Sequence, residues 1–218
     1  MRDKQRREII KHHNELFNKF GLNHASMGWP KGRTDLRFNV MSQIGNLNNS
    51  KILDVGCGFG YFLAYLKKRK KKIQYTGIDI NSDFIKLAKK KYPNHIFKVR
   101  DIEKEKVKEK FDWVFAIGLG SKACSYMYIE NLLKEMVKIS KKGVVMDFIT
   151  DYVDFKNKGT FYASPEKIFK ISKKISKRVL LKHDYLPFEF CIYIYPDDKI
   201  DLKNNTFKNF TLKQNNSS

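Results

Sequence analysis

Short apolar runs alternate along the chain with segments in which apolar residues recur every three or four positions. The short runs predict strands, and the helical spacing predicts helices. The runs occupy residues 52–55, 74–80, 96–99, 113–117, 143–150, 178–184 and 188–195. Helical spacing occupies residues 4–20, 36–44, 61–66, 84–92 and 126–142, and another helix is expected to start at Ser164. Because strands and helices take turns over most of the chain, the pattern predicts an α/β fold.

The last two predicted strands are separated only by the link Leu186-Pro187. Such a short link can join antiparallel strands, whereas parallel strands need a long crossover connection. The helix predicted at residues 126–142 is expected to end at Gly143, because glycine is the commonest residue just after a helix. We therefore expect a mostly parallel sheet that finishes in an antiparallel hairpin.

The stretch KILDVGCGFGYFLAY at residues 51–65 predicts a buried strand, a tight turn and the start of a helix. Asp54 interrupts the apolar strand just before the turn. Gly56, Gly58 and Gly60 alternate through the turn, where the lack of side chains allows unusual dihedrals and close approach of a ligand. The N-terminal amides of the helix face the same crevice. This stretch therefore predicts a site for a nucleotide-like ligand.

Two classes of nucleotide site compete at this turn. The dinucleotide fingerprint G-x-G-x-x-G/A needs a small residue at position 61, where this chain has Tyr61. The pattern D-x-G-x-G-x-G instead resembles motif I of the class I S-adenosylmethionine (SAM) dependent methyltransferases. Asp79 ends the next strand 19 residues after Gly60, which suits an acidic residue that binds ribose hydroxyls.

The resemblance covers roughly residues 29–195 and implies a Rossmann-like, seven-stranded, mostly parallel sheet with helices on both faces. It implies SAM as cofactor and S-adenosylhomocysteine (SAH) as product, with the Asp101 carboxylate accepting from the adenine amino group. Trp29 is expected to form a lid or wall, and Arg37 to bind the SAM carboxylate. The remaining predicted cofactor contacts are Asp54, Gly56, Cys57, Gly58, Gly60, Asp79, Ile80, Ile102, Ile117 and Gly118.

The segment LKHDYLPFEFCIYIY at residues 181–195 resembles a group of small-molecule methyltransferases, some of them encoded among capsule or surface-polysaccharide genes. This resemblance makes His183, Tyr185 and Glu189 the candidate catalytic residues. His183 would be a general base oriented by Asp184 or Glu189, because its ordinary pKa lies near neutrality. The alternative is a structural histidine at a strand end. No metal site is expected, because the other histidines lack ligand-like spacing.

The formal net charge of +21 raises the question of a nucleic-acid partner. Only eight of the 44 basic residues are Arg and 36 are Lys, as expected from codon usage that favours Lys and Asn throughout. The three cysteines are far apart and indicate reduced thiols. We therefore expect a cytoplasmic protein that acts on a small molecule, without a membrane partner and with nucleic acid as the less favoured partner. The oligomeric state is left open.

The length of 218 residues fits one methyltransferase domain at residues 1–200, including an N-terminal helical lid at about 1–48, and a tail at 201–218. The predicted reaction is methyl transfer from SAM to an oxygen of a small polar acceptor, with phosphorylated and sugar-linked molecules as candidates. Nitrogen is the alternative acceptor atom. The rival functions are methylation of RNA and a SAM-binding scaffold without catalysis.

Overall fold

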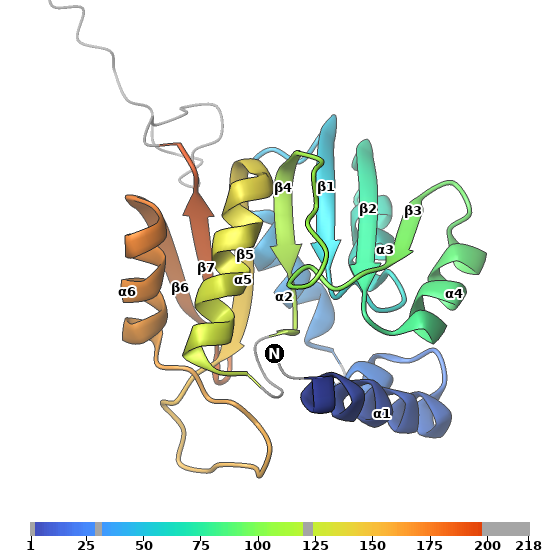
Figure 1. Ribbon diagram of the computed structural model, residues 1–218, viewed down its shortest axis with the longest axis horizontal. Coiled ribbons are helices and arrows are strands. Elements are labelled where there is room, and N and C mark those ends of the chain that lie inside the picture. The colour runs from blue at the N-terminus through green and yellow to red at the C-terminus, as the bar shows by residue number, and fades with distance from the viewer. Residues whose placement is uncertain (1–2, 29–31, 120–123, 198–218) are drawn as a thin grey trace, which may run out of the picture.

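The computed structural model describes residues 3–28, 32–119 and 124–197. Its centre is one seven-stranded sheet with the order β3-β2-β1-β4-β5-β7-β6 (Figure 1). The strands are β1 (Ser50–Val55), β2 (Ile73–Asp79), β3 (Ile96–Val99), β4 (Phe111–Ala116), β5 (Ser140–Ile149), β6 (Arg178–Leu186) and β7 (Glu189–Tyr195). The first five are parallel, and β7 pairs antiparallel with both β5 and β6. The predicted sheet with its terminal hairpin is confirmed.

Helices cover both faces of the sheet. The described residues form the helices α1 (Asp3–Phe20), α2 (Thr34–Ser42), α3 (Tyr61–Lys68), α4 (Ser82–Lys91), α5 (Tyr126–Ile139) and α6 (Pro165–Ile175), with the 3-10 helix η1 (His24–Met27) after α1. One apolar core lies under α2 and α3 and contains Phe38, Leu63 and Trp113. A second core lies under α5 and α6 and contains Leu132 and Ile168. The strands β1, β4 and β7 are thus buried on both sides, which explains why their sequences are largely apolar, whereas β3 at one edge of the sheet is mostly exposed.

The helix α5 ends earlier than the sequence predicts. It stops at Ile139, and Gly143 lies inside β5 instead of ending the helix. The Gly143 amide donates a hydrogen bond of 3.0 Å to the Ser140 hydroxyl, and this bond stabilises the first residues of the strand. A Cβ atom at Gly143 would lie 2.7 Å from Cδ1 of Ile44 and 2.9 Å from Cζ3 of Trp113. Gly143 is therefore a close-packing position, and the prediction that it ends a helix was wrong.

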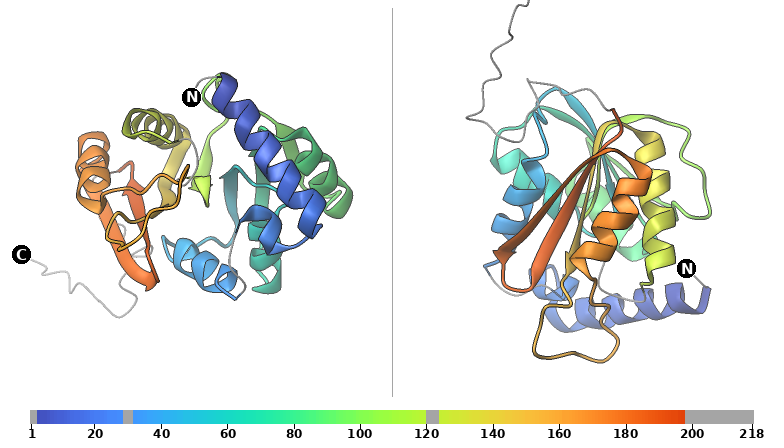
Figure 2. Two further views of the ribbon diagram at one scale, coloured as in Figure 1. Left: turned by 90° about the horizontal axis from the view of Figure 1, so that it is seen from below. Right: turned by 90° about the vertical axis from the view of Figure 1, so that its left-hand side faces the viewer.

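The carboxyl ends of the parallel strands point toward α1, which runs across them and belongs to neither helical layer (Figures 1 and 2). None of the α1 residues is fully buried. The helix is fastened by Phe17, whose ring lies 5.2 Å from that of Phe59 and 6.2 Å from that of Phe84. Of the helices that the structure describes, none has both the length and the apolar sequence needed to cross a membrane.

Candidate active site

A cavity of about 520 Å³ lies at the carboxyl ends of the parallel strands, with α1 forming part of its wall. One end is formed by Asp79 at the tip of β2 and Asp101 just after β3. The other end is formed by Asp147 of β5 and Glu189 of β7. Gly118 lies between them, after β4. In open α/β sheets, ligands bind in such a crevice outside the strand ends.

The glycine turn is held in place by the carboxylate of Asp79. The backbone amides of Gly58 and Asn81 donate to its two oxygens over 2.9 Å and 2.8 Å. Burial raises the pKa of Asp79, and these amide hydrogen bonds oppose that rise. One side chain therefore joins the turn after β1 to the loop after β2.

Each of the three glycines in the turn has a positive φ angle: +72° at Gly56, +52° at Gly58 and +78° at Gly60. A Cβ atom at Gly56 would overlap Cδ2 of Leu119, and one at Gly58 would lie 2.7 Å from Cε of Met27. Glycine is therefore favoured by the backbone conformation of the turn, and the ends of two flexible side chains pack directly on it. The intervening Cys57 is buried, and burial raises the pKa of its thiol.

Asp54 does not line the main cavity. It borders a small adjoining cavity of about 10 Å³ together with Cys57, Met27 and Gly56. Its carboxylate accepts a hydrogen bond of 2.5 Å from the Tyr75 hydroxyl. Burial raises the pKa of Asp54 to about 7, although the Tyr75 hydrogen bond opposes the rise. The predicted contact between Asp54 and the cofactor stays a prediction.

The raised pKa of Asp54 predicts a pH dependence of stability. A buried carboxyl that ionises only near pH 7 stabilises the fold at acidic pH, and this contribution is lost as pH rises from about 4 through 7. Between pH 4 and pH 7 the free energy of unfolding should therefore fall further in wild type than in Asp54→Asn. The difference between the two losses should exceed about 1 kcal/mol. Urea unfolding at both pH values measures this. The exposed Asp35→Asn is the control, and equal losses in all three proteins would contradict the prediction.

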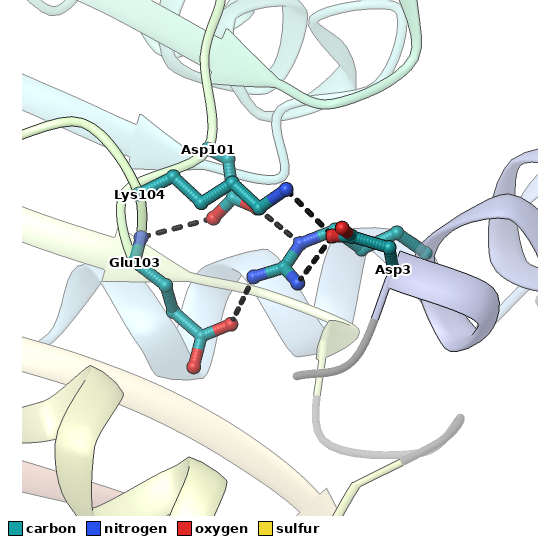
Figure 3. Close-up of polar contacts among 5 residues, drawn as sticks. Asp3, Asp101, Glu103 and Lys104 are labelled. Carbon is teal, nitrogen blue, oxygen red and sulfur yellow. Dashed lines mark hydrogen bonds and ion pairs between the residues drawn. The ribbon is translucent and has the colours of Figure 1, made fainter.

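Asp101 is already engaged by α1. Its carboxylate accepts hydrogen bonds from Nε of Arg6 and, over 2.9 Å, from the Glu103 amide. Nη2 of Arg6 lies 2.8 Å from Oε2 of Glu103 (Figure 3). Lys104 adds a 2.6 Å ion pair to Asp3 at the start of α1. These ion pairs tie the N-terminal end of α1 to the loop after β3. The predicted lid function of this helix stays a prediction, but its attachment is now defined.

We expect Arg6→Met to loosen α1, because it removes the ion pairs to Asp101 and Glu103 and keeps most of the apolar part of the side chain. A partly buried pair of this kind contributes on the order of 1 kcal/mol. Hydrogen–deuterium exchange of the α1 amides should therefore become about fivefold faster. Lys11→Met is the control, since the Lys11 side chain is 79% exposed on the same helix. If both variants exchange like wild type, the ion pairs do not hold the helix.

Arg37, Asp147 and Glu189 form the buried Arg37 cluster at the other end of the cavity. The Arg37 guanidinium donates to both oxygens of Glu189, with 3.0 Å from Nε to Oε2, and Nε lies 3.3 Å from Oδ2 of Asp147. The Gly118 amide donates to Oδ1 of Asp147 over 2.6 Å. Arg37 lines the cavity as expected, but two carboxylates of the protein already face its charge.

His183 and Tyr185 do not line the cavity. The His183 ring stacks on Phe190, its Nε2 lies 3.1 Å from Oγ1 of Thr150, and its Nδ1 lies 2.7 Å from Oδ1 of Asp184. Burial raises the pKa of Tyr185, and the Asp147 carboxylate raises it further. Of the three catalytic candidates, only Glu189 reaches the cavity, and it pairs with Arg37 instead of orienting His183.

Some of the remaining cofactor candidates line the cavity, and others lie behind it. Ile80, Ile102 and Ile117 line the cavity, whereas Gly58 and Gly60 support it from within the turn. Trp29 lies outside the described residues. Asp147 was missed, although it interrupts an apolar strand just as Asp54 does. In the described parts of the chain, no three His, Cys, Asp or Glu side chains are grouped so that they could hold a metal ion.

The fold and the position of the cavity are typical of α/β proteins that bind a nucleoside-containing ligand at the strand ends. Residues 52–143 match a family described as "Methyltransferase domain". "Putative methyltransferase Rv1506c" of Mycobacterium tuberculosis is 30% identical over 151 residues, which cover 66% of this chain and 91% of that protein. "Putative methyltransferase 235L" of Invertebrate iridescent virus 6 is 33% identical over 113 residues, which cover 50% of this chain but only 43% of that protein.

A similar fold is found in magnesium protoporphyrin IX methyltransferase from Synechocystis PCC 6803 with bound SAH. The TM-score is 0.66 at 13% identity, with 89% of this chain and 97% of that chain covered. The chain belongs to the class I SAM-dependent methyltransferase family, whose cofactor is SAM. The resemblance seen in the glycine turn is thereby confirmed at the level of family, fold and cofactor.

Proposed function

We propose that the protein transfers the methyl group of SAM to an oxygen atom of a small-molecule acceptor. The observation that carries the proposal is one cavity with a separate polar group at each end. Asp79 and Asp101 offer carboxylates at one end, and the Arg37 cluster, in which two carboxylates share one guanidinium, lies at the other. A nucleoside at the first end would leave the second end for an acceptor.

The residues at the first end suit an adenosyl group. Asp79 would accept from the ribose hydroxyls and Asp101 from the adenine amino group, while Ile80 and Ile102 supply apolar surface beside them. The glycine turn would receive the methionine part where Met27 and Leu119 now pack. Arg33 lines the cavity one helical turn before Arg37. Because two carboxylates already face the charge of Arg37, Arg33 is the stronger candidate for binding the SAM carboxylate, a role that the sequence predicts for Arg37.

Bound SAM supplies a methyl group that is already electrophilic. The chain then has to hold the acceptor oxygen in line with that group and exclude water, and such positioning accounts for about 7–11 kcal/mol when the geometry is good. The side of α1 that carries Ile9, Ile10 and Leu16 lines the cavity and would shield it from water. Asp147 and Glu189 could take up the proton that an acceptor hydroxyl loses.

Small-molecule acceptors agree with the name of the Synechocystis protein, which acts on magnesium protoporphyrin IX. Phosphorylated or sugar-linked acceptors, a place in capsule or surface-polysaccharide biosynthesis, and nitrogen as the alternative acceptor atom stay predictions from the sequence. The same holds for the cytoplasmic location.

Titration calorimetry with SAM and SAH tests the cofactor site. Wild type should bind both, and Asp79→Asn should weaken both at least about tenfold, because it removes charge from the ribose site and one acceptor of the turn. Asp83→Asn is the control, since the Asp83 side chain is 57% exposed at the start of α4. Unchanged affinity in Asp79→Asn would contradict the assignment.

The same protein then enters an assay for SAH formation with a library of small acceptors. Turnover with a small molecule supports the proposed reaction. SAM binding without turnover on any acceptor would favour a scaffold. An RNA oligonucleotide that outcompetes the small acceptors, with binding that weakens steeply as salt rises, would favour RNA methylation.

A further inference from the structure

The Arg37 cluster is a buried group of one cation and two anions in the wall of the cavity. Arg37, Asp147 and Glu189 are 5%, 4% and 7% exposed. Each carboxylate lies within ion-pair distance of the guanidinium, and Tyr185 is a further titratable group beside them. Burial raises the pKa of Asp147 to about 6, while Arg37 and the Gly118 amide oppose the rise. The cluster therefore sets two carboxyl groups against one guanidinium.

This charge balance determines which polar groups can bind there. An anionic ligand would meet a guanidinium that is already matched by two carboxylates, and it would add a further negative charge in a buried site. Ionised carboxylates only accept hydrogen bonds. A ligand group that binds to Asp147 or Glu189 must therefore bring a hydrogen, as an uncharged hydroxyl does.

Three further arginines line the cavity: Arg6, Arg33 and Arg100. Arg6 is paired with Asp101 and Glu103 at the opposite end, and Arg100 is paired with Glu105 after β3. Arg33 directly precedes α2 and would be matched by the SAM carboxylate in the role considered above. None of the three changes the excess of acceptor oxygens at Asp147 and Glu189.

Next to the cluster, the cavity wall is aromatic. The rings of Phe155 and Phe188 meet edge to face with their centres 5.3 Å apart, and the two residues are 48% and 42% exposed. Phe148, Ile149, Tyr162 and Pro187 continue this apolar wall. Exposed aromatic surface of this kind beside a few polar groups is typical of a site for an apolar ligand body.

Phe188 occupies a position that favours glycine. It has a φ angle of +67° in the β6–β7 turn, a strained conformation for a bulky side chain. Its carbonyl accepts a 2.9 Å hydrogen bond from the Thr150 amide, which fixes the turn against the end of β5. The turn therefore presents a phenylalanine ring to the cavity at a conformational cost that glycine would avoid.

We propose that the methyl acceptor is an uncharged molecule that joins a hydroxyl group to an apolar ring. The hydroxyl hydrogen-bonds to Asp147 or Glu189, and the ring packs on Phe155 and Phe188. This proposal rests on the proposed methyl transfer and narrows its acceptor.

The reaction balances without a further reagent. The hydroxyl oxygen forms a bond to the transferred methyl carbon as the carbon–sulfur bond of SAM breaks. The electron pair of that bond stays on sulfur, which becomes the neutral thioether of SAH. The hydroxyl proton passes to a carboxylate of the Arg37 cluster.

The test uses three probes that share one ring: benzyl alcohol, benzoate and phenyl phosphate. Each is titrated into the full-length protein in the presence of saturating SAH, and binding is followed by ligand-observed NMR. Benzyl alcohol should bind at least about tenfold more tightly than either anion, because only the anions add charge beside the cluster. Erythritol, which has hydroxyls but no ring, should bind more weakly than benzyl alcohol.

Two variants separate the roles of the charge and the ring. Glu189→Gln removes one negative charge with little change in size, so it should reduce the preference for benzyl alcohol over benzoate about tenfold. Phe188→Gly suits the positive φ angle and removes the ring, so it should weaken benzyl alcohol about tenfold while leaving SAH affinity unchanged. Glu130→Gln, which removes an exposed charge on α5, is the matched control.

The possible results separate this proposal from the function on which it rests. Failure of wild type to bind SAH would contradict the methyltransferase site itself. If SAH binds but the anions bind as tightly as benzyl alcohol, or no ring compound binds, the acceptor proposal is overturned. It is also overturned if Phe188→Gly binds benzyl alcohol as tightly as wild type does. The same holds if Glu189→Gln keeps the wild-type preference for benzyl alcohol over benzoate. SAH affinity in each variant shows whether the fold is intact.

Discussion

The rest of the site depends on the hydrogen bonds that the Asp79 carboxylate accepts from two backbone amides. The donors are Gly58 in the turn after β1 and Asn81 in the loop after β2. Parallel pairing of β1 and β2 brings these two strand ends to the same edge of the sheet. Burial raises the pKa of this carboxyl, and the backbone amides that solvate it oppose the rise. The same side chain thus shapes the glycine turn and faces the cavity in which a nucleoside would bind.

The cavity is polar at its two ends for different reasons. At the Asp101 end, the carboxylates are matched by Arg6 from α1, a helix without fully buried residues. At the Asp147 end, the matching cation is the buried Arg37, and two carboxylates share it. The first end can therefore change with the position of α1, whereas the second end is fixed between the core of the sheet and α2. This difference is what an enzyme needs if a cofactor must enter and an acceptor must be held in line.

Local patterns explain how much of this could be predicted from the sequence. The apolar runs and the tight link at Leu186 and Pro187 predicted the sheet and its hairpin, and the spacing from Gly60 to Asp79 predicted a cofactor site at the strand ends. The end of α5 was predicted wrongly, because Gly143 serves contacts with Trp113 and Ile44 that are distant in sequence.

The end of the cavity at the Arg37 cluster was harder to predict for the same reason. Arg37, Asp147 and Glu189 lie on three elements that are far apart along the chain, and only folding brings them together. Asp147 carried a usable signal as a charged residue inside an apolar strand. Arg6 carried none, since basic residues are frequent throughout this sequence.

The central claim is that one cavity binds the cofactor at Asp79 and Asp101 and leaves its other end for the acceptor. A crystal structure of the protein with SAH tests this claim most directly. The account predicts the ribose hydroxyls at Asp79, the adenine beside Asp101 and Ile102, and the sulfur atom directed toward the Arg37 cluster. An SAH molecule bound elsewhere, or one whose sulfur faces away from Asp147 and Glu189, would contradict it.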